Sequence, residues 1–80
     1  MVHKVQFEAN VPPIVDLISS IIIRGDDAKI ILDNGSIIEV KSHQRIRLLN
    51  NDYLEIFEDN NGDKLILGRI KLTKIIGAIS

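Results

Sequence analysis

Hydrophobic and polar residues alternate along most of this 80-residue chain, in short runs that end at Gly, Pro, Asn or Asp. Alternation with a period of two turns one set of side chains toward a core and the other toward water, so it predicts half-buried β-strands. In the first run, His3, Val5, Phe7 and Ala9 share one face. The runs predict strands over residues 2–9, 28–33, 36–42, 46–49, 53–58, 64–72 and 75–79.

Residues 14–23 fit two structures. Apolar residues recur from Ile14 at helical spacing, and Pro13 is tolerated in the first turn of a helix. The run Ile21-Ile22-Ile23 is instead typical of a strand, because β-branched side chains pack well on a pleated surface. We favour a strand here, and the alternative is a short helix near residues 13–20.

Asn34-Gly35 is the clearest turn signal in the chain. Both residue types tolerate the positive φ angles of a two-residue type I′ turn, which joins antiparallel strands. In that register Leu32 lies opposite Ile37, and Ile31 lies opposite Ile38. Apolar residues then occupy both faces near the turn, as in a hairpin wrapped into a barrel.

A second irregularity is expected at Gly68. Leu65 and Leu67 share one face of the predicted last long strand, whereas Ile70 and Leu72 share the other. Gly68 stands where the phase changes, which predicts a β-bulge. Short strands at this spacing predict one all-β domain over residues 1–80, a small antiparallel barrel of five to six strands, OB-like or Sm/SH3-like.

Composition excludes several classes of function. The net charge is −1, there is no Cys, and Ile supplies sixteen of the 80 residues. His3 and His43 do not make a zinc site, and neither has a nucleophile or orienting partner in the pattern. We therefore expect no enzyme, no metal and no cofactor. The lack of a long apolar run predicts no membrane association, and the lack of Cys and of an apolar leader favours a cytoplasmic location.

The charges are arranged in blocks. Residues 50–63 are acidic and residues 64–80 are basic, so we expect these segments to pair as a hairpin whose charges largely offset each other. Residues 41–47 have no obvious acidic partner. An extended chain projects their basic side chains to one side, as a phosphate-contacting patch or as a solvated strand edge. The block consists of Lys41, His43, Arg45 and Arg47.

Three residues outside this block extend the hypothesis. Arg69 and Lys71 enlarge the basic patch if the last strands lie beside it. Tyr53, at the start of a predicted strand, is a candidate for stacking on a base. Phe57 shares its parity but is better explained by core packing.

Segments 28–35, 46–56 and 68–70 resemble the bacterial translation initiation factor one family. The segments read Ala-Lys-Ile-Ile-Leu-Asp-Asn-Gly, Ile-Arg-Leu-Leu-Asn-Asn-Asp-Tyr-Leu-Glu-Ile and Gly-Arg-Ile. The resemblance implies a five-stranded OB barrel that binds ribosomal RNA, with Arg47 and Arg69 facing the RNA and Lys41 and Arg45 in a shortened basic segment. The order of helix, hairpin and closing strands is also similar to Sm-like barrels, which bind RNA and self-assemble.

These observations predict a binding module. The leading hypothesis is weak RNA or single-stranded nucleic-acid binding through Lys41, His43, Arg45, Arg47, Tyr53, Arg69 and Lys71. The alternative is a protein-interaction or homo-oligomeric assembly module, because 45% of the residues are hydrophobic in a chain too small to bury them all.

Overall fold

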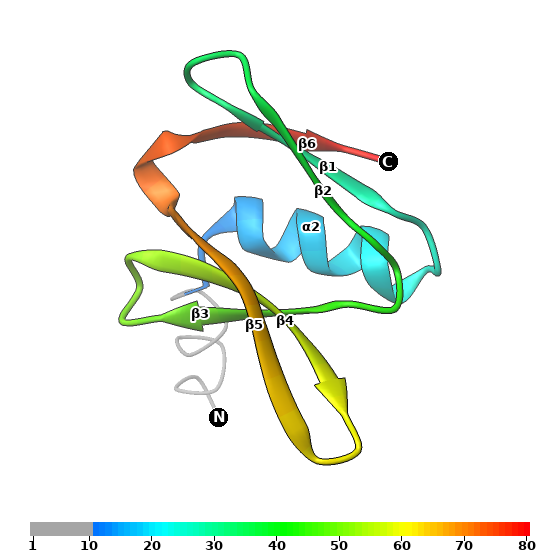
Figure 1. The fold of residues 1–80 in the computed structure, drawn as a ribbon. Coiled ribbons are helices and arrows are strands. Elements are labelled where there is room, and N and C mark those ends of the chain that lie inside the picture. The colour runs from blue at the N-terminus through cyan, green and yellow to red at the C-terminus, as the bar shows by residue number, and fades with distance from the viewer. Residues whose placement is uncertain (1–10) are drawn as a thin grey trace, which may run out of the picture.

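The computed structural model describes residues 11–80, which form two three-stranded antiparallel sheets and one helix (Figure 1). One sheet has the strand order β2-β1-β6 and the other β3-β4-β5. The predicted mainly antiparallel β architecture is confirmed, and the strand expected over residues 2–9 lies outside the described residues. The elements are α2 Pro13–Ile23, β1 Ala28–Leu32, β2 Ile37–Val40, β3 Arg45–Leu49, β4 Tyr53–Asn60, β5 Asp63–Lys71, the 3-10 turn η1 Leu72–Lys74, and β6 Ile75–Ile79.

The preference for a strand over residues 14–23 was wrong, because this segment is helix α2. Pro13 lies in the first helical turn, where its missing N–H costs nothing. At the other end, Gly25 has a φ of +93° and its N–H bonds to the carbonyl of Ile22, while the N–H of Asp26 bonds to that of Ile21. This is a Schellman motif, which ends a helix at a glycine. The isoleucine run is therefore the last turn of a capped helix.

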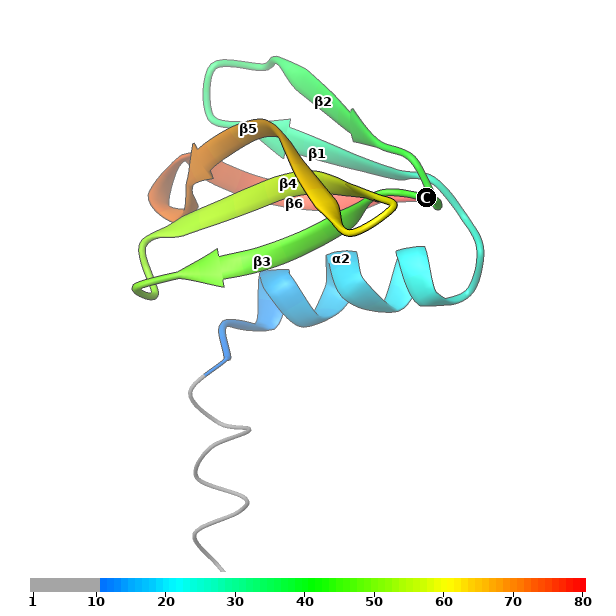
Figure 2. The ribbon, with the colours of Figure 1, turned by 60° about the horizontal axis from the view of Figure 1, so that its bottom comes forward.

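Packing against both sheets explains why the helix forms despite its β-branched residues. Val15, Ile18 and Ile21 are buried and recur every three residues along one side. Figures 1 and 2 show α2 lying across one side of the two sheets, where it contacts β1, β3 and β6. Burial of this stripe outweighs the small intrinsic cost of β-branched residues in a helix. The core comprises Val15, Ile18, Ile21, Ala28, Ile30, Val40, Leu54, Ile56, Ile70 and Ala78.

The β1–β2 hairpin exists, but its predicted register was wrong by one residue. Ile31 lies opposite Ile37, and Ile30 lies opposite Ile38. The loop has three residues, Asp33 to Gly35, and Gly35 has a φ of +87°. A three-residue loop that ends in a left-handed residue is the next most common hairpin after the two-residue turns.

The two-residue turn of the type expected at Asn34-Gly35 occurs instead between β4 and β5. Asn61 and Gly62 both have positive φ, of 54° and 87°, and they join Asn60 to its partner Asp63. Both central residues of a type I′ turn need this conformation. The predicted pairing of the acidic and basic segments as a hairpin is confirmed, and the turn makes the loop shorter than expected.

The chain passes between the sheets at two places. Residues 41–44 lead from β2 into β3, and η1 leads from β5 into β6. The β4–β5 ladder is also irregular: Ile56 pairs with Gly68 and Phe57 with Ile66, so Leu67 is the extra residue. The bulge was predicted at Gly68 and lies directly before it, where it restores the core-facing position of Ile70.

Candidate nucleic-acid interface

The β3-β4-β5 sheet has one face toward the core and one outer face. Leu54, Ile56 and Ile70 are buried on the inner face. Residues directly opposite each other in antiparallel strands project to the same face, and alternate residues project to opposite faces. The register pairs Arg47 with Glu55 and Glu55 with Arg69, so these three side chains share the outer face.

This outer face carries five basic side chains and two carboxylates, those of Glu55 and Asp59. Its net charge is therefore +3, although the net charge of the whole chain is −1. The cations stand on the flanking strands β3 and β5, in two rows about 10 Å apart at the usual strand spacing. β4 runs between the rows. We call this surface the cationic face, and its basic residues are Arg45, Arg47, Lys64, Arg69 and Lys71.

Glu55 lies at the centre of the cationic face and is fully buried. Its Oε2 accepts a hydrogen bond of 3.0 Å from Nε of Arg69. Its Oε1 lies 2.8 Å from Nη2 of Arg47 and 3.9 Å from Nζ of Lys64, but accepts no hydrogen bond of good geometry from the described residues. Burial raises the pKa of Glu55, but the hydrogen bond from Arg69 and the charges of both arginines outweigh it and hold that pKa below its ordinary value. Glu55 is therefore an anion at neutral pH.

The two aromatic residues of β4 have different surroundings. Phe57 was expected in the core, but it pairs with Arg45 and Ile66 on the outer face. Nζ of Lys64 lies 4.6 Å from the centre of the Phe57 ring, and Cζ of Arg47 lies 5.9 Å from it. Both cations therefore make cation–π contacts with this ring. Tyr53 pairs with Lys71 and is 41% exposed. Tyr53 is thus the more accessible ring for stacking.

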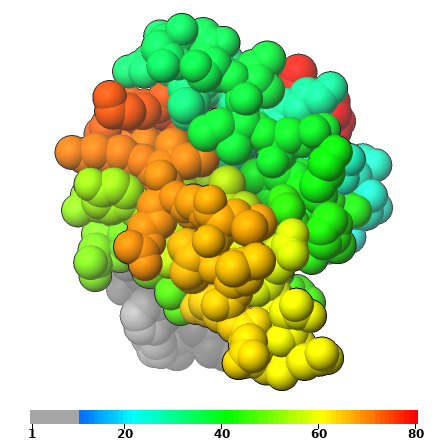
Figure 3. Space-filling view, viewed as in Figure 1, coloured from blue at the N-terminus to red at the C-terminus, as the bar shows by residue number. Residues whose placement is uncertain are grey.

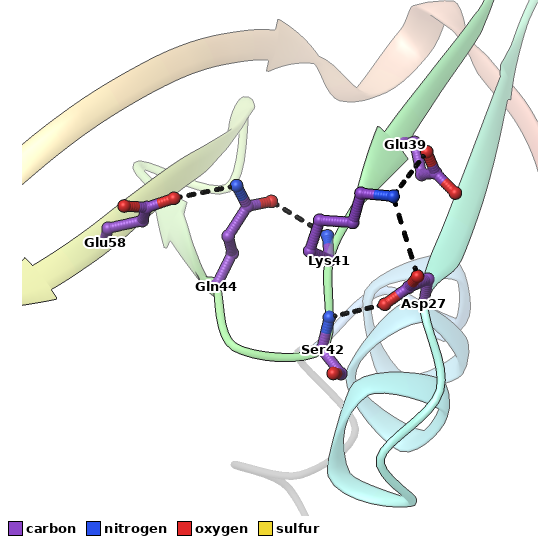
Figure 4. Close-up of polar contacts among 6 residues, drawn as sticks. All are labelled: Asp27, Glu39, Lys41, Ser42, Gln44 and Glu58. Atoms are coloured by element: carbon purple, nitrogen blue, oxygen red, sulfur yellow. Dashed lines mark hydrogen bonds and ion pairs between the residues drawn. The ribbon is translucent and has the colours of Figure 1, made fainter.

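Lys41 does not lie in a strand with Arg45 and Arg47, because residues 41–44 form a turn between the sheets. Its Nζ lies 3.0 Å from Oε1 of Glu39 and 3.7 Å from Oδ2 of Asp27 (Figure 4). The hydrogen bond with Glu39 and the Glu39 charge, with a smaller contribution from Asp27, raise the pKa of Lys41. The expectation that Lys41 has no acidic partner was wrong.

His43 also leaves the predicted stripe. Its Nε2 lies 3.3 Å from Oε2 of Glu58, which accepts a 3.0 Å hydrogen bond from Nε2 of Gln44. The hydrogen bond from Gln44 is the main reason why the pKa of Glu58 is lowered, and His43 contributes less. Oε1 of Gln44 in turn accepts a hydrogen bond from the backbone N–H of Lys41. Gln44 therefore links the turn at residues 41–44 to Glu58 of β4 (Figure 4).

The structure brings together five of the seven predicted residues: Arg45, Arg47, Tyr53, Arg69 and Lys71. Sequence reasoning missed Lys64 and the outward position of Phe57. Lys64 was assigned to charge compensation within the acidic–basic hairpin, where it does lie opposite Asp59. The dipeptide Asn61-Gly62 could have predicted the position of Lys64. A two-residue turn at these residues sets the β4–β5 register, which places Lys64 beside Phe57.

Other chemistry is sparse in the described part of the chain. A hollow of about 280 Å³ lies between β2 and β5, which are side by side on the face shown in Figure 3, with Ile38, Ile56 and Ile70 among its lining residues. Within residues 11–80 no group of His, Asp and Glu could hold a metal ion, and no helix is long and apolar enough to span a bilayer.

Comparison of the chain with models of protein families, with curated proteins and with solved structures gave no match.

Proposed function

We propose that this protein binds RNA or another single-stranded nucleic acid through the cationic face and catalyses no reaction. The observation that carries the proposal is the collection of five basic side chains on one sheet face of an otherwise weakly acidic chain. Lysine and arginine bind phosphate oxygens and release counterions from the nucleic acid, which favours binding at low salt. The expected affinity is modest because Glu55 and Asp59 reduce the positive charge.

A single strand suits this face better than a duplex. Neighbouring cations on β3 stand about 7 Å apart, at alternate positions of an extended strand, so one flexible backbone lying along β4 can reach both rows. Tyr53 on the same face can stack on one unpaired base, which a duplex does not present. The ring of Phe57 is covered by Lys64 and Arg47, so it adds little stacking.

We also propose that the two sheets are parts of one small barrel, closer to the Sm-like than to the OB arrangement. A helix precedes the first hairpin, the chain crosses between the sheets at residues 41–44, and β6 returns to β1 after η1. The segments of the initiation-factor resemblance begin at residue 28, after helix α2. These features support an Sm-like arrangement of the two sheets.

The salt dependence of binding tests the proposed function. We expect the fluorescence anisotropy of a labelled mixed-sequence RNA to rise on titration with the protein. The logarithm of the affinity should fall with the logarithm of the salt concentration, with a slope of about −2 to −3.5 for three to five phosphate contacts. The same sequence as a duplex should bind more weakly. Absence of binding to the single strand at low salt would rule out this function.

The edges of the sheets favour a second function, self-assembly. Among the described residues, β5 pairs only with β4, and β6 pairs only with β1, so each keeps one unpaired edge. Unpaired backbone N–H and C=O groups can pair with a strand of another copy. The exposed apolar residues of these strands, between 40% and 66% accessible, are Leu65, Ile66, Leu67, Ile76 and Ile79.

Light scattering at high protein concentration tests self-assembly. We expect the native protein to have a mass that is a multiple of the monomer mass. Substitution of both Leu67 and Ile76 by lysine should return it to a monomer, because charged side chains on edge strands oppose pairing. The control is Ile23→Lys, which is 81% exposed on helix α2 and belongs to neither edge strand, and which should leave the mass unchanged. A strictly monomeric native protein would contradict this function.

A further inference from the structure

Glu55 of the cationic face binds the guanidinium groups of Arg47 and Arg69, which are also the groups that would bind a phosphate. Its two oxygens meet Nη2 of Arg47 at 2.8 Å and Nε of Arg69 at 3.0 Å, one oxygen for each arginine. A carboxylate presents two acceptor oxygens to guanidinium groups much as a phosphate does with its non-bridging oxygens. The carboxylate of Glu55 therefore stands where it competes with a bound phosphate for the same donors.

The surroundings of Glu55 indicate that its carboxylate has a role besides stabilising the fold. A buried acid whose hydrogen bonds are incompletely satisfied weakens a fold, and neutral residues often replace buried ion clusters without loss of stability. Oε1 of Glu55 is held by the 2.8 Å contact with Nη2 of Arg47, and no further donor among the described residues bonds to it. The side chains of Arg47 and Arg69 are 48% and 58% exposed, so both can reach an external ligand.

We propose that Glu55 is an internal competitor that lowers the affinity of Arg47 and Arg69 for nucleic-acid phosphates and so sets the strength of binding. This inference rests on the proposed nucleic-acid function. An incoming phosphate shares or takes over the donors of Arg47 and Arg69 against the charge of Glu55. The protein then binds the nucleic acid weakly and releases it readily. Removal of the negative charge of Glu55 should raise the affinity.

The variant Glu55→Gln tests the competitor role, because it keeps the side-chain shape and removes the charge. We expect it to bind the labelled single-stranded RNA about five- to tenfold more tightly than the native protein at low salt, from the loss of one negative charge within a few ångströms of the phosphate. The matched control is Asp59→Asn, which removes the same charge from the same strand and face without touching either arginine. Its gain should stay below about threefold, because Asp59 is exposed and screened.

The gain in Glu55→Gln should also depend on the arginines. In a background that carries Arg47→Gln with Arg69→Gln, the same substitution should change the affinity less than about twofold, because the donors that Glu55 holds are gone. Equal gains in Glu55→Gln and Asp59→Asn would overturn the competitor role and leave RNA binding intact. No binding by the native protein or by either variant would instead refute the proposed function itself.

A measurement on the native protein remains decisive if Glu55→Gln fails to fold. The Nε–H group of Arg69 donates to Glu55 at 3.0 Å. Its nitrogen-15 resonance should therefore shift during titration with RNA, as that hydrogen bond is shared with phosphate. Saturation of RNA binding with an unchanged Arg69 resonance would overturn the proposal.

Discussion

Reversing the charges of Arg45 and Lys71 together, as Arg45→Glu with Lys71→Glu, should weaken RNA binding by about a hundredfold or more at low salt. Each reversal removes a phosphate contact and adds a repulsion, and the net charge of the cationic face falls from +3 to −1. The two residues stand on opposite rows of the face, and neither forms an ion pair with any described residue. The loss should therefore arise at the binding surface with little effect on the fold.

A matched control separates this local effect from a general effect of charge. Lys29→Glu with Lys74→Glu changes the net charge of the chain by the same amount, but these exposed residues belong to β1 and η1. We expect this control to lose less than about fivefold in affinity, because screening by salt limits the reach of distant charges. Anisotropy titrations of both double variants make the comparison. Equal losses would show that binding depends on net charge and not on the cationic face.

Leu54→Ala should destabilise the protein by about 2–5 kcal/mol, the range for truncating a buried leucine. Leu54 is fully buried in β4, the central strand of its sheet, and is among the largest side chains of the core. A domain of this size has a total free energy of unfolding on the order of 5 kcal/mol or somewhat more. We therefore expect urea denaturation, followed by circular dichroism, to show a large fraction of the variant unfolded without urea.

Leu65→Ala is the matched control for this loss. It makes the same chemical change on the neighbouring strand β5, where Leu65 is 53% exposed. The free energy of unfolding should change by no more than about 0.5 kcal/mol at low protein concentration, since no cavity forms at an exposed site. Similar destabilisation by both variants would mean that the core between the sheets is not organised around Leu54.

The sequence was informative where a rule acts over a few residues. Alternation predicted the strands from residue 28 onward, because a strand that packs on a core turns alternate side chains toward it and the others toward water. The blocks of opposite charge predicted the β4–β5 hairpin, and the change of phase near Gly68 predicted its bulge within one residue. The common side of Arg45 and Arg47 followed from the same alternation, whereas Arg69 and Lys71 were included only if the last strands lay beside them.

Local rules were insufficient where two conformations have similar intrinsic energies. Residues 14–23 could form a strand or a helix, and packing of Val15, Ile18 and Ile21 against both sheets selected the helix. Asn34-Gly35 could form a two- or a three-residue loop, and the pairing of Ile30 and Ile31 with β2 selected the longer one. Intrinsic preferences differ by less in such cases than the free energy gained by burial.

The composition of the candidate site also depended on tertiary pairing. Four basic residues occupy alternate positions in the sequence: Lys41, His43, Arg45 and Arg47. Contacts with Asp27 and Glu39 hold Lys41 away from the outer face, and a contact with Glu58 does the same for His43. Arg47 and Arg69 are 22 residues apart and meet only because β4 lies between their strands and places Glu55 between them. The chain thus determines by local pattern which segments are strands and which side chains point outward. Which charges neutralise one another is decided only when distant strands pair, because electrostatic contacts depend on separation in space and not along the chain.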